Sequence, residues 1–166
     1  DTNTERQMAG ENMLPVSVVI VTKNEEKNIR EALQSIEGVS EIIIVDDFST
    51  DKTVEICREF TEKVFQTEWK GYAAQKQKAI DLAAGPWVFL LDADERFTKP
   101  LSEEVKRIVE QKGAYSGFFV PRKNFFLGRW IRHGGWWPDY TLRLFRKEAA
   151  RVEARKVHEK VSVIGK

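Results

Sequence analysis

The stretch WVFLLDADE, from Trp87 to Glu95, is the part of this 166-residue chain that most strongly indicates its fold. Its five apolar residues predict a buried β-strand, and Asp92, Asp94 and Glu95 follow directly. Carboxylates grouped at the end of a buried strand repel one another and destabilise the fold unless a cation meets them. The stretch therefore predicts a strand that carries acids to a sheet edge, where they meet a cation.

Strand and helix patterns alternate around this stretch. The predicted strands are 15–23, 41–47, 63–68 and 87–91, and the predicted helices are 25–37, 52–60, 72–84 and 99–111. Asn24 is the predicted cap of the first helix, and the turn ending at Asp51 is the predicted cap of the second. This alternation predicts an α/β fold with a mostly parallel, Rossmann-like sheet and helices on both faces.

The last third of the chain, from residue 115, changes character. Further strands are predicted at 115–122, 141–147, 150–155 and 160–164, with aromatic and basic residues between them. Strict alternation would place Thr141, Arg143 and Phe145 on one face of their strand. Leu142, Leu144 and Arg146 would then lie on the other face.

Composition excludes several classes of protein. Lys and Arg number 27 against 26 Asp and Glu, so the near-neutral charge gives no sign of a nucleic-acid partner. The single cysteine, Cys57, is predicted to be a core residue and favours a reducing compartment. Neither a signal peptide nor an apolar run of about 18 residues is present, so we expect a cytoplasmic protein.

Polar clusters follow three of the predicted strands: Thr22 to Glu25, Asp46 to Asp51, and Asp92 to Glu95. Because parallel strands bring their carboxyl ends to one edge, these clusters should converge there, where ligands bind. Such oxygen ligands suit Mg²⁺ or Mn²⁺ shared with a diphosphate. The phosphate loop of ATPases, the usual dinucleotide fingerprint and the hydrolase elbow are all missing, and Cys and His are too few for zinc.

VSVVIVTKNEEKNI, EIIIVDDFSTDKTVEI and KGYAAQKQKAIDLAAGPWVFLLDADE, in this order, resemble the nucleotide-sugar domain of family-two glycosyltransferases. PRKNFFLGRWIRHGGWWPDYTLRLFRK and the later VHE are similar to the branch containing lipopolysaccharide-core β-glucosyltransferases. The resemblance covers about residues 16–159. It implies a GT-A fold and an inverting, metal-dependent transfer of a hexose from a UDP-sugar to a saccharide acceptor, here in lipopolysaccharide core or another cell-envelope glycan.

The resemblance also implies roles for individual residues. Those matched to the donor nucleotide are Thr22, Asn24, Glu25, Asp46, Asp47, Lys76 and Asp92. Asp92 and Asp94 would hold the metal, with His158 a further candidate, and Asp139 would be the catalytic base. Arg143 could face a phosphate. For three of these residues a purely structural role stays open. Lys76 could lie on a solvated helix face, Asp139 could belong to a turn, and His158 could be a structural residue whose hydrogen bonds are satisfied within the fold.

The aromatic and basic segment 124–140 has three open interpretations. Trp136, Trp137 and Arg132 could stack on and pair with a phosphorylated saccharide acceptor, because aromatic rings suit sugars and arginines suit phosphates. The same side chains could rest on an anionic membrane as a peripheral contact, or could form a second small core.

We expect a disordered tail or artificial extension over 1–14, a nucleotide-sugar-binding half over 15–114 and an acceptor-side half over 115–166. Family members continue beyond the VHE motif, whereas this chain stops seven residues later, so we expect a truncated C-terminus. Two alternatives stay open: a polyprenyl-phosphate glycosyltransferase at the membrane, and a sugar-nucleotide-binding domain without transfer activity. A receiver-like signalling domain fits poorly, because the aromatic last third departs from the repeated strand–helix pattern.

Overall fold

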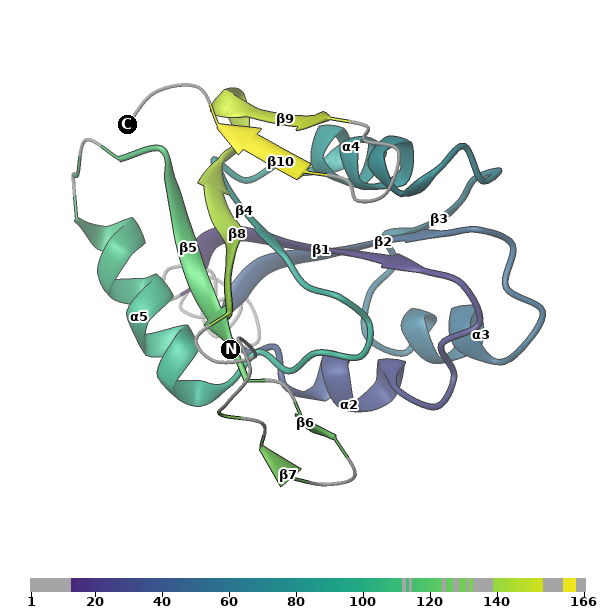
Figure 1. The fold of residues 1–166 in the computed structure, drawn as a ribbon. Helices are drawn as coiled ribbons and strands as arrows, with labels where there is room; N and C mark the ends of the chain where they lie inside the picture. The colour runs from purple at the N-terminus through teal and green to yellow at the C-terminus, as the bar shows by residue number, and fades with distance from the viewer. Residues whose placement is uncertain are drawn as a thin grey trace, which may run out of the picture.

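The computed structural model describes residues 13–111, 113, 115–123, 125–126, 129–130, 132, 139–153 and 160–163. Its main feature is a six-stranded sheet with the strand order β3-β2-β1-β4-β8-β5 (Figure 1). The strands are β1 (Leu14–Thr22), β2 (Val39–Asp46), β3 (Val64–Gln66), β4 (Trp87–Leu90), β5 (Gly117–Arg122) and β8 (Asp139–Arg146). β1 to β4 are parallel, and β8 runs antiparallel between β4 and β5.

Helices cover both faces of this sheet, which confirms the predicted α/β class. The helices are α2 (Ile29–Gln34), α3 (Thr53–Arg58), α4 (Tyr72–Leu82) and α5 (Lys99–Glu110). α2, α3 and α5 lie on one face, and α4 lies on the other beside the hairpin of β9 (Ala150–Glu153) and β10 (Lys160–Val163) (Figure 1). The short strands β6 (Phe125–Phe126) and β7 (Arg129–Trp130) pair separately, and a 3₁₀ turn, η1 (Lys147–Ala149), follows β8.

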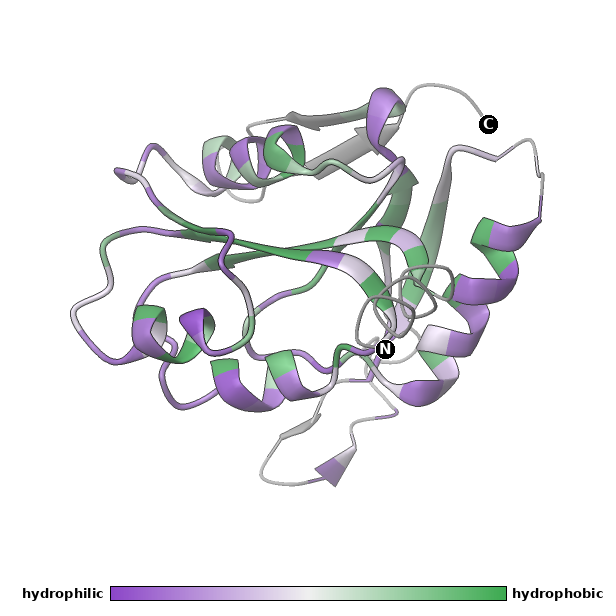
Figure 2. Cartoon of the chain, turned by 180° about the vertical axis from the view of Figure 1, so that it is seen from behind, coloured by the Kyte–Doolittle hydropathy of each residue, from purple (hydrophilic) through white to green (hydrophobic). Residues whose placement is uncertain are grey.

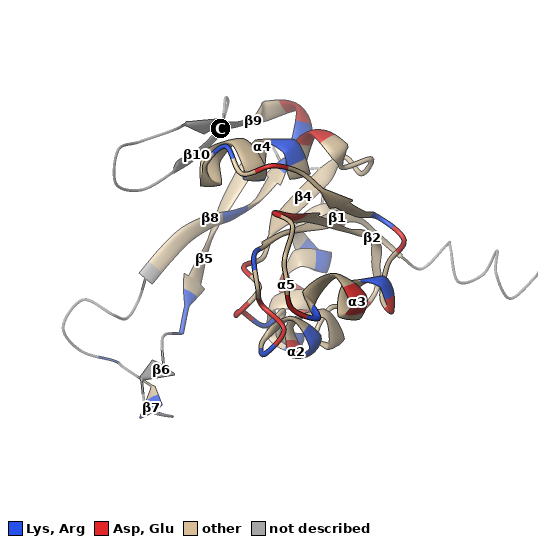
Figure 3. Ribbon diagram, turned by 90° about the vertical axis from the view of Figure 1, so that its right-hand side faces the viewer, with Lys and Arg blue, Asp and Glu red and all other residues tan. Residues whose placement is uncertain are grey.

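Each face of the sheet has its own hydrophobic core, because successive side chains of a strand point to opposite sides. In β1, Val16, Val18 and Ile20 join the core under α2, α3 and α5. Val19 joins the core under α4. The central strands are accordingly apolar, while polar residues lie on the outer sides of the helices (Figure 2). Charged residues also concentrate on helices and loops (Figure 3).

Cys57 is fully buried in the first core, as the sequence predicted. Burial, with a smaller contribution from the charge of Asp46, raises the pKa of its thiol to about 12. The thiol is therefore an inert packing group at neutral pH.

Two local predictions are wrong. The first helix is short, beginning at Ile29, and its cap position is Asn28. Asn24 has a φ of 51° and belongs to a turn before the helix. The cap position of α3 is Lys52, and the predicted residue Asp51 lies just before it, where its Oδ1 accepts a hydrogen bond from Thr53 N at 2.9 Å.

The second error concerns β8, where the predicted alternation fails. Leu144 pairs with Phe118 and Leu142 pairs with Phe119, so Arg143 is an extra residue in a β-bulge. As a result, Leu142 packs in the same core as Phe145. A bulge bends its strand and changes the direction in which a side chain points, and no period-two pattern anticipates it.

β5 and β8 come from the predicted acceptor-side half, yet they complete the same sheet as β1 to β4. The boundary near residue 114 therefore stays a prediction about function. Within the described part of the chain, no helix combines the length and apolar character needed to cross a lipid bilayer.

Candidate functional site

Polar side chains gather at the edge of the sheet where β1, β2 and β4 end. The parallel register pairs Thr22 directly with Asp46, and Asp92 follows β4 two residues after its last residue. β8 runs the other way, so its first residue, Asp139, begins at this same edge and pairs with Arg122 of β5. Two separate clusters form here, one around Asp46 and one around Asp92.

Asp46 is fully buried, and its carboxylate accepts four hydrogen bonds. Thr22 Oγ1 and Ser49 Oγ both donate to Oδ1 at 2.6 Å. Ser49 N donates to Oδ2 at 2.8 Å, and Gln66 Nε2 donates to the same oxygen at 3.4 Å. Asp46 thereby ties the ends of β1 and β3 to the loop after β2.

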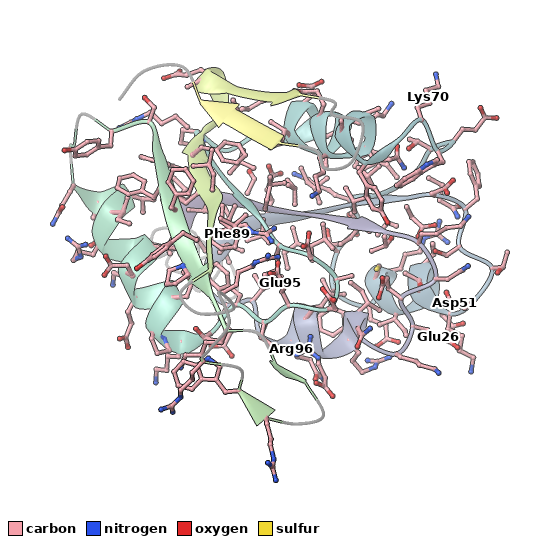
Figure 4. All side chains as sticks on the ribbon, viewed as in Figure 1. Glu26, Asp51, Lys70, Phe89, Glu95 and Arg96 are labelled. Atoms are coloured by element: carbon pink, nitrogen blue, oxygen red, sulfur yellow. The ribbon has the colours of Figure 1, made fainter. Side chains whose placement is uncertain are left out.

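The loops after β1 and β2 are joined side by side. Asn24 Oδ1 accepts a hydrogen bond from Thr50 N at 2.8 Å, and Asn24 N donates to Ser49 Oγ at 2.8 Å. Glu26 N donates to Asp51 Oδ2 at 3.2 Å, and these two residues lie together near α2 and α3 in Figure 4. The left-handed turn at Asn24 brings these backbone groups together, which is its role in place of helix capping.

Asp47 and Glu25 are held by the same pair of loops. Asp47 accepts a hydrogen bond from Trp69 N at 3.1 Å and forms an ion pair with Lys23 at 3.2 Å. Glu25 N donates to Thr53 Oγ1 at 2.8 Å. All of the predicted nucleoside residues from β1 and β2 therefore lie in one hydrogen-bonded unit.

The second cluster is the turn that follows β4. Glu95 N donates to Asp92 O at 2.9 Å, and Asp92 N donates back to Glu95 Oε1 at 2.8 Å. Ala93 points into the core, whereas Asp94 is exposed. Figure 4 shows Glu95 toward the centre of the molecule. The turn is therefore closed in both directions and presents Asp94 outward.

Arg143 is the cation that meets this turn. Its side chain is almost completely buried, with Nη1 donating to Leu90 O at 3.2 Å. Nη2 lies 3.1 Å from Asp92 Oδ2 and within 3.1–3.2 Å of both Glu95 oxygens. The β-bulge sets this position, so the strand irregularity carries a guanidinium to the acids. The acids of the stretch 87–95 thus contact a cation that the chain itself supplies.

The local charges set the proton affinities of the acids. Burial favours a higher pKa for Asp92, but Arg143, with smaller contributions from Lys76 and Arg122, holds that pKa below its ordinary value. Burial raises the pKa of Glu95, because the attraction of Arg143 does not outweigh burial and the neighbouring charge of Asp92. Asp92 is therefore the member of the pair that stays ionised most readily.

The turn suits a divalent cation that a ligand helps to coordinate. Neither Asp92 Oδ1 nor the Asp94 carboxylate forms a hydrogen bond with any residue that the structure describes. No group of three or more Asp, Glu, His and Cys side chains forms a ready-made metal cage in the described ranges. Mg²⁺ characteristically takes one or two protein carboxylates and completes its shell with phosphate and water. The donor set fits that arrangement.

Other predicted residues are distributed around this edge. Lys76 is half-buried on α4, and its charge lowers the pKa of Asp92. Arg132 is exposed, with its guanidinium 4.1 Å from the ring centroid of Trp130. The backbone of Asp139 is placed as described above. The predictions for Trp136, Trp137 and His158 lie outside the described residues.

Sequence reasoning missed the roles of Arg122 and Glu95. Arg122 lies at the edge beside Asp139 and acts on Asp92, and its only sequence signal is its position at the end of a predicted strand. Glu95 was treated as one acid among three, although its spacing of three from Asp92 suits a turn. Gln75 is buried on α4, and its Oε1 accepts a hydrogen bond from Thr67 Oγ1 at 2.7 Å.

The polar clusters lie at the edge of an open α/β sheet where the parallel strands end, which is where doubly wound folds, many of them nucleotide-binding, hold their ligands. The model of the family described as Glycosyl transferase family 2 matches residues 17–163, so the chain belongs to this family. A curated relative is the lipopolysaccharide core biosynthesis glycosyltransferase LpsC of Rhizobium meliloti, 33% identical over 157 residues. That match covers 88% of this chain and 56% of LpsC, so the chain spans about half of that relative.

Solved structures confirm the GT-A fold. TarS of S. aureus in complex with UDP-GlcNAc matches 81% of this chain and 46% of its own, at a TM-score of 0.60 and 20% identity. The mannosyltransferase PcManGT of Pyrobaculum calidifontis, in complex with GDP-Man and Mn²⁺, matches 66% of this chain and 36% of its own. Its TM-score is 0.54 at 25% identity.

Proposed function

We propose that this chain carries the donor site and the base of an inverting glycosyltransferase that moves a hexose from a UDP-sugar to a saccharide acceptor. The acceptor would belong to lipopolysaccharide core or another cell-envelope glycan. One observation carries the proposal: a closed turn after β4 presents Asp92 and Asp94 at the sheet edge beside a buried guanidinium. The relationship to LpsC supports the glycan class, and the UDP-GlcNAc bound by TarS supports the donor class.

The diphosphate of the donor would lie over the Asp92–Glu95 turn. A divalent Mg²⁺ or Mn²⁺ held by Asp92 and Asp94 would neutralise charge that develops on the UDP leaving group. His158 is a further candidate ligand. Arg143 and Lys76 are the two cationic residues for which the sequence suggested a phosphate, and the positive charge of each lowers the pKa of Asp92. They would attract the diphosphate and hold it against the sheet edge.

The nucleoside would lie over the ends of β1 and β2, beside Thr22, Asn24, Glu25 and Asp47. Asp46 is already saturated by its own chain. For Asp46 to accept a uracil N–H, the base would replace the bond from Gln66, which at 3.4 Å is the longest of the four. The joined loops would otherwise contribute a rigid floor, which lowers the entropic cost of binding.

Inversion requires a base on the face of the sugar opposite the leaving group. We assign this role to Asp139, which begins β8 at the same edge as Asp92. Its carboxylate would take the proton of the acceptor hydroxyl as that oxygen attacks the anomeric carbon. Trp136, Trp137 and Arg132 would bind the acceptor by ring stacking and phosphate pairing, and could support peripheral contact with the cytoplasmic face of a membrane.

A transfer assay tests this proposal. The protein is incubated with UDP-glucose, UDP-galactose or UDP-GlcNAc, with Mn²⁺ or Mg²⁺, and with either a lipopolysaccharide-core oligosaccharide or a polyprenyl phosphate. We expect transfer to the oligosaccharide with inverted configuration, read from the anomeric NMR coupling. Asp139→Asn should lower turnover by at least about 10²-fold while UDP binding persists.

Asp81→Asn, which alters an exposed acid at the far end of α4, is the matched control and should transfer normally. A preference for polyprenyl phosphate as the acceptor would indicate a polyprenyl-phosphate glycosyltransferase instead. UDP binding without transfer by any pair of substrates would contradict the catalytic part of the proposal.

A further inference from the structure

Glu95 has no assigned role in the reaction, yet it makes more contacts in the turn than either proposed metal ligand. Its Oε1 accepts the hydrogen bond from Asp92 N at 2.8 Å, and its backbone N donates to Asp92 O at 2.9 Å. The turn is also fixed beyond it, since Phe97 packs edge-on against Phe89 with ring centroids 4.9 Å apart. Glu95 therefore sets the backbone conformation from which Asp92 and Asp94 project.

Glu95 also competes with Asp92 for Arg143. A single nitrogen, Nη2, carries two hydrogens but faces three carboxylate oxygens within 3.2 Å, one from Asp92 and two from Glu95. Nη1 is directed to Leu90 O, and Nε is buried without a partner among the described residues. Two hydrogens cannot bond three oxygens at full strength, so Asp92 and Glu95 compete for the same guanidinium nitrogen.

We propose that Glu95 is a positioning residue for the donor's cation: it holds the turn closed and shares Arg143 with Asp92, which leaves Asp92 Oδ1 available to a divalent metal. This inference rests on the proposed function, because it concerns the same cation. Without the Glu95 charge, Arg143 would pair with Asp92 alone and compete with the metal for its oxygens. Removal of such an outer partner weakens metal affinity by about 10- to 100-fold.

The test is Glu95→Gln in the full chain. The amide oxygen of Gln can still accept the Asp92 N–H bond, so the turn is retained while the charge that holds Arg143 is lost. Free Mn²⁺ is measured by electron paramagnetic resonance in the presence of UDP, and thermal unfolding is recorded alongside. We expect Mn²⁺ affinity to fall about 10-fold or more, with little change in the unfolding temperature.

Glu41→Gln is the matched control. Glu41 is also a largely buried carboxylate that pairs with a cation, Lys63, and accepts a backbone N–H, from Ala84, but it lies away from the carboxyl edge. Its variant should bind Mn²⁺ normally. Glu95→Asp is a second test, since it keeps the charge but is too short to span both partners, and it should also weaken Mn²⁺ binding.

The route through Arg143 is checked by combining variants. In Arg143→Met the competitor is gone, so adding Glu95→Gln should weaken Mn²⁺ affinity much less than it does in the wild type. If a folded Glu95→Gln or Glu95→Asp variant binds Mn²⁺ as tightly as the wild type, the inference about Glu95 is overturned while the proposed function stands. Absence of Mn²⁺ binding by the wild type with UDP would overturn the proposed function and this inference with it.

Discussion

The turns that follow β2 and β4 both contain an aspartate bound to another strand, but they are bonded differently. Asp46 is fully buried and its oxygens accept four hydrogen bonds from neutral donors. Asp92 and Glu95 share one guanidinium nitrogen, and their side chains are 39% and 23% exposed. The Asp46 carboxylate has a full set of hydrogen bonds, whereas in the turn after β4 Asp92 Oδ1 and the Asp94 carboxylate form none with a described residue.

This difference indicates how one edge of the sheet can be held rigidly and still have carboxylates that could bind a ligand. The neutral donors around Asp46 satisfy its buried carboxylate, and they join the ends of β1 and β3 to the loop after β2. The turn after β4 is closed by two hydrogen bonds between Asp92 and Glu95, but Asp92 Oδ1 and the Asp94 carboxylate accept none from a described residue. We therefore expect stability to depend mainly on Asp46, and the proposed metal binding to depend on Asp92 and Asp94.

The largest effect on stability is expected from Asp46→Ala. The substitution leaves the Thr22 hydroxyl and the Ser49 amide without their buried acceptor, and each unsatisfied group costs about 1 to 3 kcal/mol. We expect the free energy of unfolding, measured in urea, to fall by about 3 kcal/mol. A loss below about 1 kcal/mol would mean that the Asp46 network is not structural.

Arg143→Met should have a smaller effect. The guanidinium is buried, but water reaches both acids, so the loss stays below the about 3 to 5 kcal/mol typical of a broken buried ion pair. We expect about 2 kcal/mol by the same urea titration. A loss greater than that of Asp46→Ala would contradict the division between a structural and a binding turn.

Much of this edge could be predicted from the sequence, because parallel strands bring their carboxyl ends together. Thr22, Asp46 and Asp92 were placed at one edge on that basis alone. Arg143 was assigned to phosphate, but its pairing with Asp92 could not be found, since it depends on one extra residue in β8. A bulge is decided by tertiary packing of both neighbouring strands, which local periodicity does not contain.

The position of Asn24 was mispredicted for a related reason. Asn is a good helix cap, but here its backbone takes a φ of 51° and its side chain binds the neighbouring loop at Thr50. Loop–loop hydrogen bonds between β1 and β2 outweigh the local capping preference. Glu95 illustrates the same limit, because a carboxylate that helps to close a turn and one that binds metal have the same sequence signature.

Glu41→Gln should produce the smallest change and extends the comparison to a carboxylate outside the site. Burial favours a higher pKa for Glu41, but hydrogen bonds from Lys63, Ser17 and Ala84 N hold its pKa below the ordinary value of 4.5. A lowered pKa contributes stability above pH 4.5 that is lost as the pH falls through the folded-state value.

The wild type should therefore exceed Glu41→Gln by about 1 kcal/mol at pH 7, and the difference should disappear in more acidic solution. Urea titrations at a series of pH values measure this. A difference that is independent of pH would show that the charge of Glu41 contributes nothing.

The most direct test of the central claim is a thermal-unfolding titration with UDP, with and without Mn²⁺, on the wild type and on Asp94→Ala. Asp94 is exposed and forms no hydrogen bond with a described residue, so the variant should unfold at the wild-type temperature without ligand. UDP with Mn²⁺ at about 100 times the dissociation constant should stabilise the wild type by about 2.7 kcal/mol. We expect this Mn²⁺-dependent stabilisation to be lost in Asp94→Ala, and equal stabilisation of both proteins would contradict a metal site at the turn after β4.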